Sequence, residues 1–373
     1  MNRSTACGIA ATLFAALVLA KFSPQTAFTS LIRFGETRQE RRLDSLRQLP
    51  LATVPGSSGY DGQFYAQIAL DPLLLDPTLP AALDAPSYRA RRILVPAIAA
   101  IAGQGNAWWT LQAYALLNAL CWFALGWLLY RQIDPDRGHA FARWAGCMFS
   151  LGVLDSVRQS LVDLPALLML VLATTAFTKA YSSRSALWLA LANLAKETSL
   201  LGSFALLAGK PLHPLTWRHA AMALLSAALP LALWSVYVQQ RFASAPGTDG
   251  LGNFTWPLLG LFAQVKNALR EVSFGNVDSR YIFSLVGVAG LGTQAWVLWR
   301  SPHPQSPWWR IGAAYSILLV FLSPWVWSGY WAAFRAVLPM TIAYNLLLPA
   351  GRSFWPLWIL GNLTMLHGVW RFL

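Results

Sequence analysis

The segment "SSGYDGQFYAQIALDP", residues 57–72, places a carboxylate, Asp61, immediately before a short helical pattern. Phe64 and Ile68 form an apolar stripe at helical spacing, and Tyr65 stands four residues after Asp61. Two interpretations of Asp61 are open. It is either a helix N-cap that accepts hydrogen bonds from the free N–H groups of the first turn, or a catalytic carboxylate on a helix that lies in a membrane interface.

Cations follow in "YRARRILVP", where Arg89 and Arg92 are three residues apart. This spacing predicts a shared helix face, because residues i and i+3 are neighbours on a helix surface. Two guanidinium groups on one face suit the binding of a phosphate at headgroup level. A basic stripe that contacts anionic lipid headgroups is the alternative.

Charges also interrupt the apolar segments themselves. Lys196 and Glu197 lie in "AKETS" in the middle of an apolar stretch, and insertion of such a charge costs roughly 2.5–3.5 kcal/mol. Adjacent helical residues point about 100° apart, so a bend is needed before both can face one cavity. Otherwise they pair with polar neighbours and only hold the bundle together. Asp163 follows a helix–loop–helix junction that contains Asp155 and Arg158, and Arg335 begins "FRAVLPM", where snorkelling is its alternative.

The composition indicates a polytopic membrane protein. The chain is 56% hydrophobic and 12% charged, whereas a soluble domain carries about 25% charged residues. Long apolar runs predict an all-α bundle of about nine to eleven spans and exclude a barrel of alternating segments. The net charge of +13 lies in short loops between these runs, which favours contact with anionic lipid over nucleic acid. Many of the tryptophans stand at segment ends, where indole rings suit the headgroup level.

The positions of the basic loops predict the topology, since such loops stay in the cytoplasm. The first apolar run, 6–20, is either a cleaved signal peptide or, as we favour, an uncleaved anchor. Residues 21–91 then form a first external loop and 240–278 a second large one. Residues 88–104 form an interfacial or partly inserted helix, which Pro96 interrupts. The clear spans are expected at 107–130, 140–155, 161–180, 217–238, 279–299, 309–325, 333–349 and 353–371.

One apolar segment, 185–208, lies between two basic loops. It is either a hairpin of two half-helices with Lys196 and Glu197 at the bend, or a single crossing with one misplaced loop. The rest of the chain shows no repeat or separate soluble domain, so residues 1–373 are taken as one membrane-embedded domain. Cys7, Cys121 and Cys147 lie in apolar stretches without metal-like or paired spacing. We find no metal, phosphate-loop or Ser-His-Asp pattern.

At these residues the sequence resembles the GT-C superfamily of integral-membrane glycosyltransferases. The motifs that carry the likeness are "GYDGQFYAQIALDP", "YRARRILVP", "AKETS" and "FRAVLP", in that order along most of the chain. The resemblance implies a helical bundle with interfacial helices in the first external loop, which carries an essential acidic residue. That role falls on Asp61. Asp61 is followed by Gly62 rather than a second acidic residue, so a two-carboxylate metal site in this loop is not expected, and dependence on a divalent cation stays open.

The resemblance also implies the reaction and its partners. A sugar would pass, with inversion, from a polyprenyl-phosphate donor to an envelope glycan, lipid or protein at the periplasmic face of a bacterial inner membrane, with Asp61 as general base. A lipid-linked sugar or polysaccharide transporter without transferase activity is the alternative, and an inactive assembly partner is a second rival. The residues expected to contact substrate are Gln63, Tyr65, Tyr88, Arg89, Arg92, Asp163, Lys196, Glu197 and Arg335.

Overall fold

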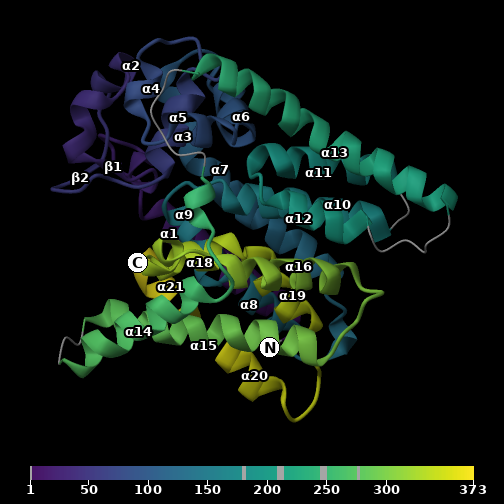
Figure 1. Ribbon diagram of the computed structural model, residues 1–373. Helices are drawn as coiled ribbons and strands as arrows, with labels where there is room; N and C mark the ends of the chain where they lie inside the picture. The colour runs from purple at the N-terminus through teal and green to yellow at the C-terminus, as the bar shows by residue number, and fades with distance from the viewer. Residues whose placement is uncertain (1, 179–181, 208–213, 244–249, 275–277) are drawn as a thin grey trace.

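The computed structural model describes residues 2–178, 182–207, 214–243, 250–274 and 278–373, and it is mostly helical (Figure 1). The first helix is α1, Arg3–Leu19. Its Phe14 stacks on Trp122 with ring centroids 3.8 Å apart, and Arg3 Nη1 donates to the Ile133 carbonyl at 2.8 Å. The helix therefore packs into the core.

A layer of short elements follows α1 and forms the upper left of Figure 1. Its two strands, β1 and β2, pair in parallel with Phe34 opposite Thr53. Gln67 joins the layer together, because its side chain accepts from Leu43 N at 3.0 Å and donates to the Ala82 carbonyl at 3.0 Å. The elements are η1 Thr29–Leu31, β1 Phe34–Gly35, η2 Glu36–Arg41, α2 Asp44–Arg47, β2 Thr53–Val54, α3 Gly62–Leu70, α4 Leu79–Ala82, α5 Pro86–Ala90 and α6 Leu94–Gly103.

The longer helices pack beside one another in the remainder of the molecule. The first half contains α7 Ala107–Gln132, η3 Pro135–Arg137, α8 Ala140–Met148, α9 Leu151–Arg158, α10 Asp163–Thr178, α11 Ser182–Ala195, α12 Ser199–Leu207 and α13 Pro214–Arg241. The second half contains η4 Leu251–Asn253, α14 Leu259–Ser273, α15 Ser279–Arg300, α16 Pro307–Phe321, α17 Pro324–Ser328, α18 Tyr330–Ala336, α19 Leu338–Leu347, α20 Phe354–Gly361 and α21 Met365–Phe372.

Within the described residues, three helical stretches are long and apolar enough to cross a membrane: Ala107–Gln132, Ala221–Arg241 and Ser279–Arg300. Several other predicted spans are divided. Residues 140–155 fall in α8 and α9, 333–349 in α18 and α19, and 353–371 in α20 and α21. No single helix therefore fills any of these three predicted spans. Within α13, Leu225, Leu229 and Leu233 are more than half exposed, as expected for a helix that faces lipid rather than water.

The predicted interfacial helix over 88–104 is also divided, but not at Pro96. The break lies between α5 and α6 at residues 91–93, and Pro96 is the third residue of α6. A proline is tolerated in the first turn because the N–H that it lacks would have no partner inside the helix. Arg89 and Arg92 consequently stand on either side of a helix end, and the shared helix face predicted for them was wrong.

The segment predicted at 185–208 is described as far as residue 207, with residue 208 outside the described residues, and it forms a hairpin, which is the first of the two predicted alternatives. Helices α11 and α12 are separated by Lys196, Glu197 and Thr198. Ser203 Oγ donates to Asn193 Oδ1 at 3.4 Å, although ten residues of continuous helix would span about 15 Å. The second half-helix therefore returns alongside the first.

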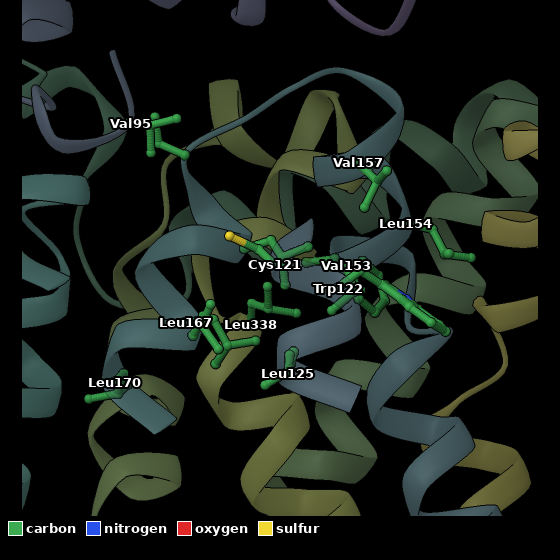
Figure 2. Packing of buried hydrophobic residues seen from close by; sticks show 14 of the residues in the cluster. Val95, Cys121, Trp122, Leu125, Val153, Leu154, Val157, Leu167, Leu170 and Leu338 are labelled. Carbon is green, nitrogen blue, oxygen red and sulfur yellow. The ribbon is translucent and has the colours of Figure 1, made fainter. Parts of the chain in front are cut away.

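The core lies between these helices. Figure 2 shows Trp122 and Leu125 of α7 among side chains of α9, α10 and α19, including Val153, Leu167 and Leu338. Trp122 is 1% exposed, and its Nε1 donates to the Met148 carbonyl at 3.0 Å, so the buried indole keeps its hydrogen bond. The three cysteines are free and buried, as their apolar surroundings in the sequence predict.

Candidate functional site

Asp61 immediately precedes α3, but it does not cap that helix. Its carboxylate makes no hydrogen bond to the first-turn N–H groups. Instead, Oδ1 lies 2.8 Å from Arg89 Nη2, and Oδ2 lies 3.3 Å from Arg335 Nη2. The capping interpretation is therefore wrong, and the side chain that could have stabilised α3 is directed to cations from two other segments.

Gly62 explains how Asp61 reaches these cations. A Cβ at residue 62 would lie 2.1 Å from the Gln159 carbonyl oxygen and 3.0 Å from that of Ile32. Since both atoms belong to backbone, only glycine allows the start of α3 to approach the end of α9 this closely. The glycine that follows the carboxylate is thus a packing requirement of the site.

Arg89 is oriented by a second carboxylate, Asp84, which the sequence analysis missed. Its Nε lies 2.9 Å from Asp84 Oδ1, and its Nη2 lies 2.8 Å from Asp84 Oδ2. This is the two-bond geometry in which guanidinium and carboxylate planes match. Asp84 stands in the turn before α5, five residues before Arg89, and that proximity was the available signal.

Arg92 pairs with Glu197, which lies 105 residues later in the bend between α11 and α12. The Nε–Oε2 distance is 2.8 Å and the Nη2–Oε1 distance is 2.5 Å. The Tyr65 hydroxyl accepts from Arg92 Nη1 at 2.7 Å and from Arg89 Nη1 at 3.3 Å. Arg92 also donates to the Tyr88 hydroxyl. The two arginines of "YRARRILVP" therefore converge on one tyrosine of the opening motif.

Lys196 and Arg335 complete the network. Lys196 Nζ lies 2.5 Å from Asp163 Oδ1 and 3.3 Å from the Arg335 carbonyl oxygen. Arg335 Nε lies 4.0 Å from Asp163 Oδ2. Arg335 lies in α18 rather than at the start of a span, and its side chain is 12% exposed. It does not snorkel to solvent, and it connects Asp61 to Asp163.

The network is balanced in charge, because four carboxylates face four cations. Burial alone would raise the pKa of Asp61, but the guanidinium groups of Arg89 and Arg335 hold that pKa well below its usual range. Asp61 is consequently ionised but weakly basic while both contacts are present. The eight residues are Asp61, Asp84, Asp163, Glu197, Arg89, Arg92, Lys196 and Arg335.

Two N–H donor atoms of the Arg335 guanidinium are left for a further hydrogen-bond acceptor. Its Nε and Nη1 atoms are buried and have no hydrogen-bond acceptor among the described residues. A cavity of about 10 Å³ adjoins them and is lined by Asp163, Lys196, Ser199 and Tyr315, among others. That volume suits about one water-sized group. An oxygen atom of an anionic ligand there would satisfy donors that the protein leaves unpaired.

Several neighbours complete the surroundings. The Tyr60 hydroxyl accepts from Trp331 Nε1 at 2.8 Å, and Arg335 lies over the Tyr60 ring at 5.2 Å; the sequence analysis missed both aromatic residues, although Tyr60 directly precedes Asp61. Gln63 does not join the network, since its amide bonds Gly35 N and the Ser58 carbonyl. From the second large loop, Asn253 Nδ2 donates to the Tyr88 hydroxyl at 3.2 Å.

No group of three or more metal-ligating side chains is placed to hold a metal ion in the described part of the chain. The chain matches no family model, no curated protein and no solved structure. The geometry of the network and the chemistry of its residues therefore carry the functional argument.

Proposed function

We propose that the chain is a membrane glycosyltransferase that uses a polyprenyl-phosphate sugar, with Asp61 as general base. The observation that carries the proposal is the buried charge network, in which Asp61 contacts Arg335, whose Nε and Nη1 have no acceptor. Charges are kept in such surroundings at a cost, which favours a functional role. Cations beside a carboxylate suit a reaction in which a phosphate leaves and a hydroxyl attacks.

The donor phosphate would bind the free Arg335 N–H groups and Lys196. A phosphate there shares the guanidinium with Asp61, so it weakens the hold of Arg335 on the carboxylate and makes Asp61 more basic. The acceptor oxygen then forms a bond to the anomeric carbon while the bond from that carbon to the phosphate oxygen breaks. The phosphate leaves with the electron pair, and Asp61 takes the hydroxyl proton.

The membrane arrangement belongs to the same proposal. About nine to eleven segments would cross a bacterial inner membrane, several of them as broken helices whose breaks are enclosed by protein. The Asp61 network would face the periplasm, and the basic loops would stay in the cytoplasm. Substrate contacts are proposed for Tyr65, Tyr88, Arg89, Arg92, Asp163, Lys196, Glu197 and Arg335.

Reconstituted vesicles test the proposal directly. Radiolabelled polyprenyl-phosphate sugars and envelope acceptors would be supplied to the unaltered protein, Asp61→Asn and Asp44→Asn. Asp44 is the matched control, because it is an exposed aspartate in the same loop. We expect Asp61→Asn to lower transfer about 10²- to 10⁴-fold and Asp44→Asn to leave it unchanged. Full transfer by folded Asp61→Asn would overturn the assignment, and flux of the lipid-linked sugar without transfer would replace it with a transporter.

A further inference from the structure

A second group of charged residues lies behind Tyr60, at the junction of α9 and α21. Asp155 of α9 is 2% exposed, and its Oδ1 lies 3.3 Å from Arg371 Nη1. Neither Asp155 oxygen nor Arg371 Nη1 has a hydrogen-bond partner in the described residues. The Arg371 guanidinium lies over the Trp331 ring at 4.6 Å, so its position is held by an ion pair and a ring contact.

Two more arginines approach this pair from different segments. Arg158 ends α9, one turn after Asp155. Arg33 lies before β1, and its carbonyl accepts from Tyr60 N at 3.1 Å. The close contact of Gly62 with the Ile32 and Gln159 carbonyls joins the two backbones next to these arginines.

Asp155 is the only carboxylate among the described residues whose charge acts on Arg33 and Arg158, and neither arginine forms an ion pair with it. Both residues are half-buried, and their side chains form no hydrogen bond or ion pair with other described residues. Arg371 is paired with Asp155, and Arg33 and Arg158 are near enough for the same carboxylate to act on them, so three guanidinium groups share one negative charge and leave an excess of two positive charges. The Asp61 network, in contrast, balances four cations with four carboxylates.

The pKa shifts of the arginines agree with this excess of positive charge. Burial, together with repulsion from Arg33 and Arg371, lowers the pKa of Arg158 to about 10. Burial and repulsion from Arg371 also lower the pKa of Arg33. Lys21 adds another positive charge beside Arg158. Like charges held together in partly dry surroundings are relieved by a bound anion.

We propose that Arg33, Arg158 and Arg371 form a binding site for a phosphate group, separate from the site at Arg335. Guanidinium groups bind phosphate through paired N–H donors, and a doubly charged phosphate would neutralise the excess. Tyr60 adjoins both groups of charges, since its ring lies against Arg335 and its hydroxyl is near enough for the charge of Asp155 to act on it. The phosphate belongs either to a soluble molecule or to the headgroup of an anionic lipid.

The test measures phosphate binding without any sugar donor, so its result does not depend on whether the protein is a transferase. The full chain would be placed in nanodiscs of zwitterionic lipid, and its binding of inorganic phosphate would be followed by ³¹P NMR. A parallel preparation with phosphatidylglycerol would be examined by native mass spectrometry for retained anionic lipid. Phosphate binding without retained lipid indicates a soluble ligand, and retained lipid indicates a headgroup.

Two variants should change binding in opposite directions. Arg158→Gln removes one donor group, and we expect at least tenfold weaker binding. Asp155→Asn removes the one carboxylate among the described residues that acts on these arginines, so we expect tighter binding, which a misfolded protein would not show. Arg41→Gln, an exposed arginine of the same first loop, is the control and should bind as the unaltered chain does. Unchanged binding in Arg158→Gln and Asp155→Asn, or an equal loss in Arg41→Gln, would overturn the proposal.

Discussion

Arg89 Nη2 lies 2.8 Å from Asp61 Oδ1 and also 2.8 Å from Asp84 Oδ2. One guanidinium thus holds two carboxylates, but only Asp61 also reaches Arg335, at 3.3 Å. Both aspartates therefore contact Arg89, but of the two only Asp61 also contacts Arg335. This difference separates a role in chemistry from a role in positioning Arg89.

Exchange of each aspartate for asparagine should reveal that difference. Asp84→Asn keeps the shape of the side chain and leaves Arg89 paired with Asp61, so we expect a loss of turnover of less than about tenfold. Asp61→Asn removes the proposed base, so the loss should reach about 10²- to 10⁴-fold. Initial rates of sugar transfer in vesicles measure both. Equal losses in the two variants would assign the effect to the geometry of Arg89 instead.

The depressed pKa of Asp61 predicts the pH profile of the free enzyme. A group whose pKa is lowered on folding contributes stability above its unfolded pKa, near pH 4, and that contribution is lost as the pH falls through the folded value. Asp61 should therefore stay ionised, and kcat/KM should show no acid limb from it between about pH 5 and 8. Arg89 is the strongest of the charges that lower this pKa.

Replacement of Arg89 checks the cause of this shift. Arg89→Gln removes the charge and should raise the pKa of Asp61, which moves the acid limb of kcat/KM to higher pH. Arg89→Lys keeps the charge and should move the limb less. The measurement is kcat/KM for transfer across the pH range, with folding confirmed at each pH. An acid limb that is the same in all three proteins would contradict the assignment to Asp61.

The pair formed by Arg92 and Glu197 should be coupled in stability. Removing one partner of a buried ion pair costs about 3–5 kcal/mol, because the other charge stays buried and uncompensated. Arg92→Met and Glu197→Met should each destabilise the protein by that order. The double variant leaves no isolated charge, so its cost should be well below the sum. Unfolding titrations of the four proteins measure the coupling, and additive costs would show that the two side chains do not depend on each other.

The sequence predicted which charged residues come together more successfully than it predicted the contacts between them. A buried charge needs a partner or a function, so Lys196, Glu197 and Arg335 could be recognised from their apolar surroundings alone. Their partners could not, because Arg92 and Glu197 are 105 residues apart and no local pattern records such a pairing. Asp84 was missed because a single aspartate in a short turn before a proline is an ordinary feature of a loop.

The breaks within the predicted spans could not be predicted from the apolar runs of the sequence either. Only Phe149 and Ser150 separate α8 from α9, and only Val337 separates α18 from α19, so no charged residue marks either break. A hydropathy window has no signal for such a break, which becomes tolerable only when other segments satisfy the released backbone groups. The hairpin at Lys196 was predictable because charged residues mark its bend.

Gly62 connects the fold to the proposed chemistry, since it sets the position of Asp61. A Cβ at residue 62 would lie 2.1 Å from the Gln159 carbonyl oxygen, so Gly62→Ala must displace backbone. We expect a cost of about 1–3 kcal/mol and a loss of transfer. Gly8→Ala is the matched control, because a Cβ there meets nothing within 4 Å and alanine favours a helix by about 0.5–1 kcal/mol. Thermal unfolding in detergent and transfer assays measure both variants. A Gly62→Ala protein as stable and active as Gly8→Ala would show that the close approach of α3 to α9 is not needed to position Asp61.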